Sequence, residues 1–415
     1  MSASRGACPT LFTPMQTGDG LLARFVPADR ITPARFIAFC AAAERHGNGT
    51  IEVSARGSLQ VRGLSAQSAP LFAADTEQLG IAAQGVPIIT NPLVSDPAAL
   101  VDASEIAAAL RAAFDAEGLT LAPKVSVIVD GGGTLHLDAL AADVRLRAIN
   151  TNGGPCFQVA LAGDAATATP LGSIPIAGAV DVVLDLLRAI AARGDARAAD
   201  LLRSEGLAAF QTRSCLRRDV SPPQPRPAAE IIGLRPLRND RFALGVVLAF
   251  GHARADVLAD LMRAAADRGV SVVRPAPDRA VLLIGVRQTD AVALAREAER
   301  LDFIVRADDP RRRIIACPGR PACASGLIAS RAIAAQIARL AQSPGNGLAV
   351  HVSGCRKGCA HPAAAALTIV GTERGCGIVH DGSARAVPQT CIDPANIAAE
   401  FARFATSEAA HARTI

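Results

Sequence analysis

Residues 314–370 read IIACPGRPACASGLIASRAIAAQIARLAQSPGNGLAVHVSGCRKGCAHPAAAALTIV. This stretch contains Cys317-x5-Cys323, a run of helical character, and a short apolar segment that ends in Cys355-x3-Cys359. Four thiolates in two local pairs are the ligand set that an iron–sulfur cube requires. The stretch therefore predicts a 4Fe-4S cluster held by these four cysteines.

The residues around the two cysteine pairs favour loops that can turn the thiols inward. Gly319, Pro318 and Pro321 keep the first loop out of regular structure. Gly354 and Gly358 do the same around the second pair. We expect both loops to present their thiols to one point.

A helix is expected between the two pairs, from Ser325 to about Leu340. The positive end of its dipole would face the cluster, which suits a group ligated by thiolates. The alternatives are a zinc knot and four ordinary buried cysteines. Zinc ligands usually occur in tighter C-x2-4-C pairs, and core cysteines are not expected between glycines, so the iron–sulfur interpretation is favoured.

Composition narrows the class of protein. The chain has 415 residues, of which half are apolar and a fifth are charged, enough for a sizeable core and for several domains or a repeated one. No uninterrupted apolar run could cross a membrane, and the N-terminal MSASRGACPTLFTP lacks a signal-peptide pattern, so we expect a cytoplasmic protein with no membrane partner. The net charge of +5 and the absence of Trp and Tyr argue against nucleic acid as a partner.

Cysteine and lysine usage adds two details. Lysine occurs only at Lys124 and Lys357, and Lys357 lies between the last two cluster cysteines. The six cysteines outside the two pairs are scattered, and in a reducing compartment we expect them to be buried or free thiols. They are Cys8, Cys40, Cys156, Cys215, Cys376 and Cys391.

An internal repeat organises the chain. Residues 20–64 read as strand, helix, strand, strand, with Thr32 and Pro33 marking the start of the helix, and the same order returns over residues 239–286. IITNPLVSDP from Ile88 likewise aligns with IIACPGRPAC from Ile314. This alignment places Asn91 at the position of Cys317, so only the second half keeps cluster ligands.

The repeat predicts the domain organisation. Residues 1–80 and 228–300 would be ferredoxin-like half-domains, residues 81–220 and 301–415 larger α/β domains, and the Pro-rich SPPQPRP of residues 221–227 a linker. Within the first α/β domain we expect a strand from Lys124 to Val129 and helices from Ala177 to Ala192 and from Ala196 to Phe210. The fold class is α+β and duplicated.

These features resemble the sulfite and nitrite reductase family. C-x5-C followed by GC-x2-GC is similar to the family's cluster motif, and the family is built from two such halves. The resemblance implies a 4Fe-4S cluster on Cys317, Cys323, Cys355 and Cys359, the last of which bridges the cluster and a siroheme iron in the reductases. It leaves open whether siroheme or a mononuclear non-heme iron lies beside the cluster here.

The resemblance also implies a tetrapyrrole site. Siroheme and the precorrins carry acetate and propionate carboxylates at their rims, which arginine can bind bidentately. Arg56, in SARGSLQVRG, falls where the reductases place an arginine for these carboxylates, and Gln60 and Arg62 follow on the same strand. Lys124 matches the first of two reductase lysines, but Ser126 replaces the second. Lys357 is a further candidate, and a solvated strand face is the alternative for Arg56, Arg62 and Lys124.

Within the family, the likeness is greatest to members that act in aerobic cobalamin biosynthesis. It is carried by ACPTLFTPMQTGDGLLARF, ERHGNGTIEVSARGSLQVRGL, CPGRPACASG and SGCRKGCAHP. The implied activity is that of a monooxygenase that hydroxylates precorrin-3A at a meso carbon with O2, after which an acetate closes to a lactone, with an external electron donor. The catalytic acid and base are not indicated.

Two other functions remain open from the sequence. One is a sulfite or nitrite reductase that uses siroheme and the cluster, although the loss of the second lysine argues against it. The other is an electron carrier or a zinc-stapled binding module, which the size and duplication of the chain argue against. His351, His361 and His380 lack a metal-ligand spacing and are expected to be core or surface residues.

Overall fold

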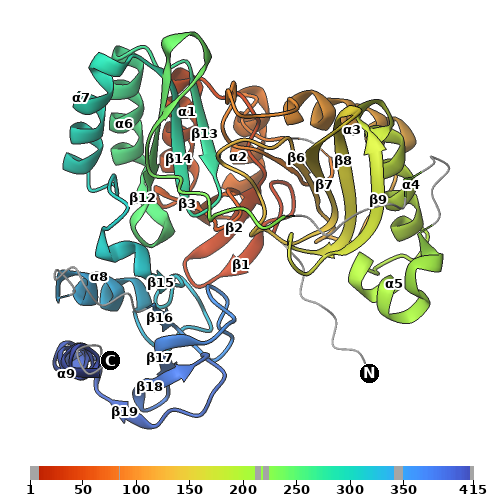
Figure 1. The fold of residues 1–415 in the computed structure, drawn as a ribbon. Coiled ribbons are helices and arrows are strands. Elements are labelled where there is room, and N and C mark those ends of the chain that lie inside the picture. Colours follow the sequence, from red (N-terminus) through yellow and green to blue (C-terminus); the bar gives the residue numbers. More distant parts are fainter. Residues whose placement is uncertain (1–8, 84, 211–215, 218–223, 341–348, 412–415) are drawn as a thin grey trace.

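The computed structural model of the chain describes residues 9–83, 85–210, 216–217, 224–340 and 349–411 (Figure 1). Within these residues the strands form four sheets, of two kinds that each occur twice. Two sheets are antiparallel, and two mix parallel with antiparallel pairing. No described helix is long and apolar enough to cross a membrane.

The first antiparallel part consists of β1 (Met15–Thr17), β2 (Gly20–Phe25), α1 (Pro33–His46), β3 (Thr50–Val53), β4 (Leu59–Leu64) and α2 (Ser68–Gln78). Its strands have the order β1-β2-β4-β3. Helix α1 begins as predicted, because the side chain of Thr32 accepts a hydrogen bond from the amide of Arg35 at 3.3 Å and Pro33 occupies the first turn.

The second antiparallel part repeats the first. It consists of β10 (Gly233–Pro236), β11 (Phe242–Val247), β12 (His252–Arg254), α6 (Ala255–Asp267), β13 (Val272–Ala276), β14 (Ala280–Val286) and α7 (Gln288–Arg300). Its sheet order, β10-β11-β14-β13, matches β1-β2-β4-β3 strand for strand. The added strand β12 leaves this sheet and pairs with β3 of the first part.

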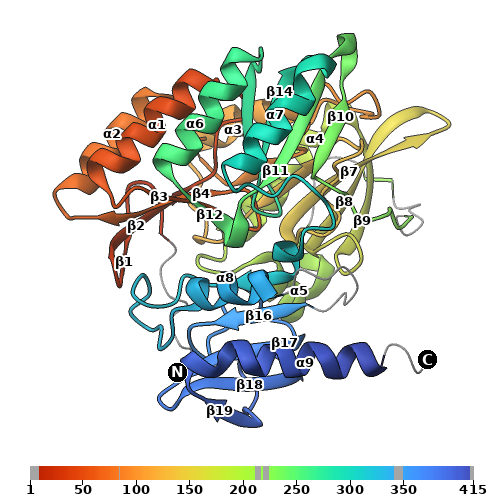
Figure 2. The same ribbon diagram turned by 90° about the vertical axis from the view of Figure 1, so that its left-hand side faces the viewer.

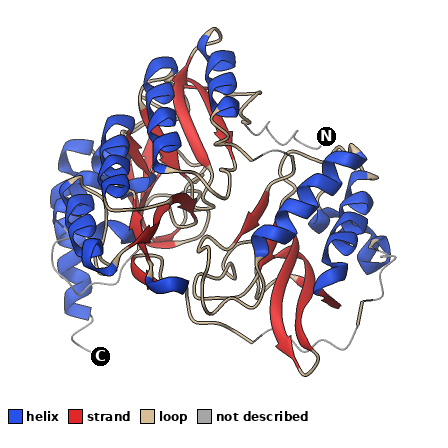
Figure 3. Cartoon of the chain, turned by 90° about the horizontal axis from the view of Figure 1, so that it is seen from above, coloured by secondary structure: helices blue, strands red, loops and turns tan. Residues whose placement is uncertain are grey.

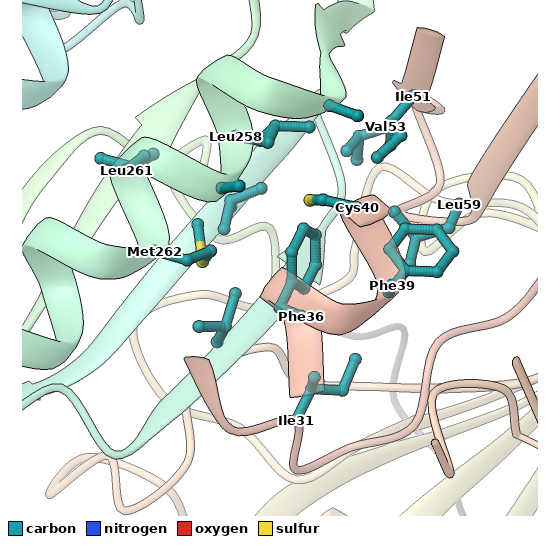
Figure 4. Packing of buried hydrophobic residues seen from close by; sticks show 14 of the residues in the cluster. Ile31, Phe36, Phe39, Cys40, Ile51, Val53, Leu59, Leu258, Leu261 and Met262 are labelled. Carbon is teal, nitrogen blue, oxygen red and sulfur yellow. The ribbon is translucent and has the colours of Figure 1, made fainter. Parts of the chain in front are cut away.

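The two antiparallel parts share one hydrophobic core (Figure 4). Phe36 and Cys40 of α1 face Leu258 and Met262 of α6, and all four are buried. The rings of Phe36 and Phe39 meet edge to face, with centroids 5.6 Å apart. Because each buried phenylalanine contributes roughly 1.5–3 kcal/mol, this core fixes the two halves of the chain relative to each other.

The two mixed sheets also repeat each other. The first contains β5 (Ile88–Thr90), β6 (Val127–Asp130), β7 (Ala142–Thr151), β8 (Gly154–Gly163) and β9 (Thr169–Pro175), and the second contains β15 (Ile314–Ala316), β16 (Val350–Ser353), β17 (Ala365–Thr372), β18 (Gly375–Gly382) and β19 (Thr390–Ile392). In each sheet the strands lie in sequence order, with the first two pairings parallel and the last two antiparallel. This confirms the predicted duplication and the α+β class.

Helices pack against both mixed sheets (Figure 3). The first sheet packs against α3 (Ala103–Glu117), α4 (Ala179–Ala191) and α5 (Ala198–Glu205), and the second against α8 (Ser330–Leu340) and α9 (Ile397–His411). Figure 2 shows α9 running along the second sheet. Short 3-10 turns occur at Ile176–Gly178, Gly206–Ala209, Arg238–Asp240, Ala249–Gly251, Pro310–Arg313 and Pro394–Asn396.

Three predicted elements have different bounds. The strand expected from Lys124 begins at Val127, because Pro123 favours a turn in which the amide of Val125 donates to the carbonyl of Ala122. The helix expected from Ser325 begins at Ser330. The residues before Ser330 are not helical, because they bond to the second cysteine loop instead. The amide of Leu327 donates to the carbonyl of Gly354 at 2.7 Å.

The third is the helix expected from Ala196 to Phe210. It ends at Glu205, since Gly206 has a φ of +68° and breaks the helix before a 3-10 turn. Cys8, Cys215 and the first part of the predicted linker, residues 221–223, lie outside the described residues.

Candidate functional site

The two cysteine loops meet at one edge of the second mixed sheet. Cys317 directly follows β15, and Gly354 and Cys355 directly follow β16. Because β15 and β16 are parallel neighbours, their carboxyl ends lie side by side. The amide of Gly354 donates a hydrogen bond to the Sγ of Cys317 at 3.0 Å, so the two loops are in direct contact.

Glycines allow this close approach. A Cβ on Gly354 would lie 3.0 Å from the Cα of Gly319 and 3.3 Å from the Cα of Gly326, closer than side chains normally pack. Gly319 and Gly358 each have a φ of +62°, which residues with a Cβ rarely adopt. The predicted glycines therefore act in two ways. Gly354 lets the two loops approach because it has no side chain, and Gly319 and Gly358 adopt a backbone conformation that other residues rarely adopt.

The four thiols of the cysteine pairs share one electrostatic environment. Burial raises the pKa of the Cys359 thiol, and the negative charges of the other three thiolates raise it further. The first turn of α8 is also close, since the Sγ of Cys317 lies 3.6 Å from the Oγ of Ser330. A thiolate-ligated group between the loops would therefore face the positive end of this helix.

The donor set fits a cluster better than a single ion. Among the described residues, no three His, Cys, Asp or Glu side chains converge closely enough to hold one metal ion. In an iron–sulfur cube each thiolate binds a different iron, so the ligand sulfurs are spaced more widely than around one ion. Four thiols on two facing loops, free of disulfides, are compatible with that arrangement.

A large cavity lies between the first antiparallel part and the first mixed sheet. Its volume is about 1080 Å³, slightly above the usual range of small-molecule sites, which is roughly 300–1,000 Å³. Its wall includes the segment before β1, strand β2, the turn between β3 and β4, the segment before β6 and helix α5. Five cations line it, namely Arg24, Arg56, Lys124, Arg197 and Arg203.

Arg56 joins the two walls of the cavity. Its guanidinium donates to the carbonyl of Ala141 at 2.6 Å and to the Oγ of Ser126 at 3.3 Å. Burial and the neighbouring cation of Arg197 both lower the pKa of Arg56, while Asp143 opposes the shift. Nearby negative charge therefore does not fully balance the positive charge of Arg56, and an anionic ligand in the cavity would stabilise it.

Gln60 and Arg62, also predicted to contact a tetrapyrrole, are not among the residues that line this cavity. Gln60 accepts from the Nε of Arg24 at 2.8 Å and donates to Glu52 at 2.8 Å. Arg62 is almost fully buried, pairs with Asp19 at 3.0 Å, and donates to the carbonyl of Ala322 between the first two cysteines.

These contacts form a chain of polar side chains from the cavity to the cysteine loops. Arg24 lines the cavity and is held by Gln60, and Gln60 is held by Glu52. Glu52 also pairs with Arg331 of α8 at 2.6 Å and with Arg62 at 3.6 Å. The chain connects the cavity wall with the domain that carries the cysteines.

The remaining predicted site residue, Lys357, lies on the second cysteine loop. Its Nζ donates to the Oγ of Ser325 at 2.9 Å, so it bridges the two cysteine loops. His351 is fully buried and its ring lies 5.6 Å from that of His361. Burial and His361 lower the pKa of His351 to about 4, so its imidazole is neutral near pH 7, as a core histidine would be.

Arg24 and Arg197 were not singled out from the sequence. Arg24 is the direct cross-strand partner of Gln60 on β2 and β4, so a correct strand pairing would have found it. Arg197 precedes α5 and its Nε lies 2.7 Å from Asp143. No local signal distinguishes it, because its position depends on how α5 packs on the sheet.

Comparisons with known proteins agree with this geometry. Residues 13–79 match the model of the nitrite/sulfite reductase ferredoxin-like half domain. The solved structure of the NirA protein of Mycobacterium tuberculosis superimposes with a TM-score of 0.73, at 16% sequence identity, over 91% of this chain and 79% of that one. The fold and the paired cysteine loops therefore define a protein of the sulfite and nitrite reductase class.

A curated protein extends the comparison to nearly the full length. A precorrin-3B synthase from Sinorhizobium sp. is 39% identical over 412 residues, which cover 97% of this chain and 88% of that protein. The chain belongs to the precorrin-3B synthase family.

Proposed function

We propose that this protein hydroxylates precorrin-3A with O2 to form precorrin-3B in aerobic cobalamin biosynthesis. The observation that carries the proposal beyond family membership is the cavity of about 1080 Å³ lined by five cations. Precorrin-3A is a large, partly methylated macrocycle with acetate and propionate groups at its rim. A large cavity with guanidinium groups on its wall suits such a ligand, because arginine binds carboxylates bidentately.

Arg56 and Lys124 are the predicted carboxylate-binding residues whose positions in the cavity support that role. Arg24 joins them. Its guanidinium donates to Gln60, which in turn donates to Glu52, so the position of the guanidinium is fixed. Cations held in place by other side chains lose little conformational freedom when the ligand binds. We therefore assign tetrapyrrole orientation to Arg24, Arg56 and Lys124, and a positioning role to Gln60.

Cys317, Cys323, Cys355 and Cys359 are the proposed ligands of a 4Fe-4S cluster. When bound, the cluster would store and pass on single electrons, and an iron beside it, either in siroheme or without a haem, would supply the one-electron chemistry that O2 requires. The residues of this chain hold the thiolates on two closely packed glycine-containing loops, and they connect the cluster domain to the cavity through Glu52 and Arg331.

The proposed reaction balances with an external donor of two electrons. One oxygen atom of O2 enters a new C–O bond at a meso carbon, and the other leaves as water with two protons and the two donated electrons. An oxygen of the adjacent acetate then adds to a neighbouring doubly bonded ring carbon as a lactone, and its acid proton moves to the ring, so this step needs no further electrons. The donor is a separate redox partner, because the sequence contains no nicotinamide or flavin motif.

An isotope experiment tests the proposal. Anaerobically purified protein is given precorrin-3A and a chemical reductant, then exposed to 18O2, and the product is analysed by mass spectrometry. The product should be heavier by one labelled oxygen atom and should form only when O2 is admitted. Turnover under strict anaerobiosis, or a new hydroxyl without label, would rule out the monooxygenase assignment.

A further inference from the structure

Phe12 is exposed although its ring is large and apolar. It leaves 59% of its surface accessible, and it is the one phenylalanine among the exposed large apolar residues of the described part of the chain. The chain has no Trp and no Tyr, so few aromatic rings are available for a binding site. Single exposed apolar residues are common on protein surfaces, but Phe12 is among the residues that line the large cavity, where it is available to a ligand.

The backbone around Phe12 holds the ring in this exposed position. Leu11, directly before it, is buried in the core shared by the antiparallel parts. The amide of Thr10 donates to the carbonyl of Thr13 at 3.0 Å, and the amide of Thr13 donates to the Oγ1 of Thr10 at 2.8 Å. With Leu11 anchored inward and the turn closed by Thr10 and Thr13, Phe12 is directed away from the core.

Phe12 lines the same cavity as the proposed carboxylate-binding cations. Those cations suit the charged rim of a macrocycle, but they do not cover its flat apolar faces. Burial of an exposed aromatic ring against a flat conjugated surface is favourable through apolar contact and offset stacking. Leu11, Phe25 and Val26 also line the cavity, although Leu11 and Phe25 are buried in the core and leave little of their own surface exposed.

We propose that Phe12 packs against a face of the bound tetrapyrrole and sets the position of the macrocycle between the cations. This inference rests on the proposed function, since it requires a tetrapyrrole in the cavity. It assigns a positioning role to the segment before β1. Arg56 and Lys124 would then bind the rim, and Phe12 would bind the face.

Binding of uroporphyrin III, a stable tetrapyrrole with carboxylates at its rim, tests the inference by absorbance titration of the full-length protein. Phe12→Ala should weaken binding by about tenfold and reduce the shift of the porphyrin absorbance band on binding. Phe12→Tyr keeps the aromatic face and should bind as the unmodified protein does. Leu71→Ala is the matched control, because Leu71 is 58% exposed on α2 and does not line the cavity.

Salt separates this contact from the charged ones. The loss caused by Phe12→Ala should be equal at low and high ionic strength, whereas Arg56→Ala should flatten the salt dependence of binding. Thermal unfolding should be unchanged in Phe12→Ala, because the ring is exposed in the free protein. If the unmodified protein binds no tetrapyrrole, the proposed function fails. If it binds and Phe12→Ala binds equally well, only the role of Phe12 is overturned.

Discussion

The amide of Gly354 donates a hydrogen bond to the sulfur of Cys317, with the two atoms 3.0 Å apart. The first half of the chain contains the same contact with different chemistry, since the amide of Gly131 donates to the Oδ1 of Asn91 at 2.6 Å. Asn91 follows β5 as Cys317 follows β15, and Gly131 follows β6 as Gly354 follows β16. The duplicated scaffold thus keeps one backbone donor at the end of its second strand and changes only the acceptor.

This relationship accounts for the asymmetry of the two halves. In the first half, the side-chain nitrogen of Asn91 also donates to Asp130 at 2.9 Å and to the carbonyl of Gly132 at 3.0 Å, which closes the loop on itself. In the second half, a thiolate cannot donate such bonds and is free to bind metal. The predicted equivalence of Asn91 and Cys317 is confirmed by their places in the two sheets.

The cluster ligands can be tested by single replacements. Cys317→Ser, Cys323→Ser, Cys355→Ser and Cys359→Ser should each abolish the broad brown absorbance of a 4Fe-4S cluster, because a hydroxyl is a poorer ligand than a thiolate for this iron. Cys156→Ser and Cys391→Ser are controls, since both thiols are half-buried and lie outside the two cysteine loops. Loss of the cluster in a control, together with its retention in one of the four, would show that the ligand assignment is wrong.

The packing of Gly354 predicts a second effect on the cluster. Gly354→Ala places a methyl group about 3 Å from the Cα of Gly319, so the two cysteine loops should separate and the protein should retain less iron and sulfide after purification. Gly153→Ala is a matched control, because its new methyl group would have no neighbour closer than 3.8 Å. Equal iron content in both variants would contradict the role of close loop packing.

Much of this arrangement could be predicted from the sequence because its signals are local. Thr32 and Pro33 start α1, and the spacing of the cysteines and glycines locates both cysteine loops. The register of β15 with β16 then brings the loops together without further information. The duplication was visible for the same reason, since each half repeats its local patterns.

The residue roles and the helix start that could not be predicted from the sequence depend on tertiary contacts. Gln60 and Arg62 lie on one strand as predicted. Gln60 donates to Glu52 and Arg62 pairs with Asp19, so both side chains bind other residues of the protein. Helix α8 starts later than its sequence suggests, because Leu327 bonds to Gly354 in the opposite loop. Arg24 and Arg197 reach the cavity only through strand pairing and helix packing.

Arg56 and Lys124 should matter for tetrapyrrole binding and not for the cluster. Arg56→Ala and Lys124→Ala should each weaken uroporphyrin III binding by roughly thirtyfold, which corresponds to about 2 kcal/mol for a charge-assisted pair. The iron and sulfide content should stay unchanged. Arg300→Ala is a control, because Arg300 is exposed on α7 and pairs with Glu297. Unchanged affinity in both cavity variants would mean that these cations are solvated wall residues.

Arg62 should behave differently from the cavity cations. Its guanidinium is buried between Asp19 and Glu52, so Arg62→Ala would leave two carboxylates without this partner. We expect the free energy of unfolding to fall by roughly 3–5 kcal/mol, measured by urea denaturation without any tetrapyrrole. The variant should also lose iron, because Arg62 holds the carbonyl of Ala322 in the first cysteine loop. A variant with normal stability and iron content, but weak tetrapyrrole binding, would instead support direct contact with the ligand.

The final prediction separates this protein from the reductases of its class. Reduction of sulfite or nitrite requires positive charge that binds the anion and assists its protonation. The resemblance to the reductases predicts that Ser126 replaces their second lysine, and the Oγ of Ser126 accepts a hydrogen bond from Arg56. The protein should therefore reduce either anion slowly or not at all with a chemical reductant.

Ser126→Lys tests the reason for this difference. The new cation would lie beside Arg56 and restore the missing charge, yet it should not restore reductase activity unless siroheme is also present, because the anion needs an iron to bind. Activity is measured as consumption of reduced methyl viologen with nitrite, and the absorbance spectrum of each preparation reports siroheme. Rapid nitrite reduction by the unmodified protein, with a siroheme band in its spectrum, would favour a reductase over the oxygenase.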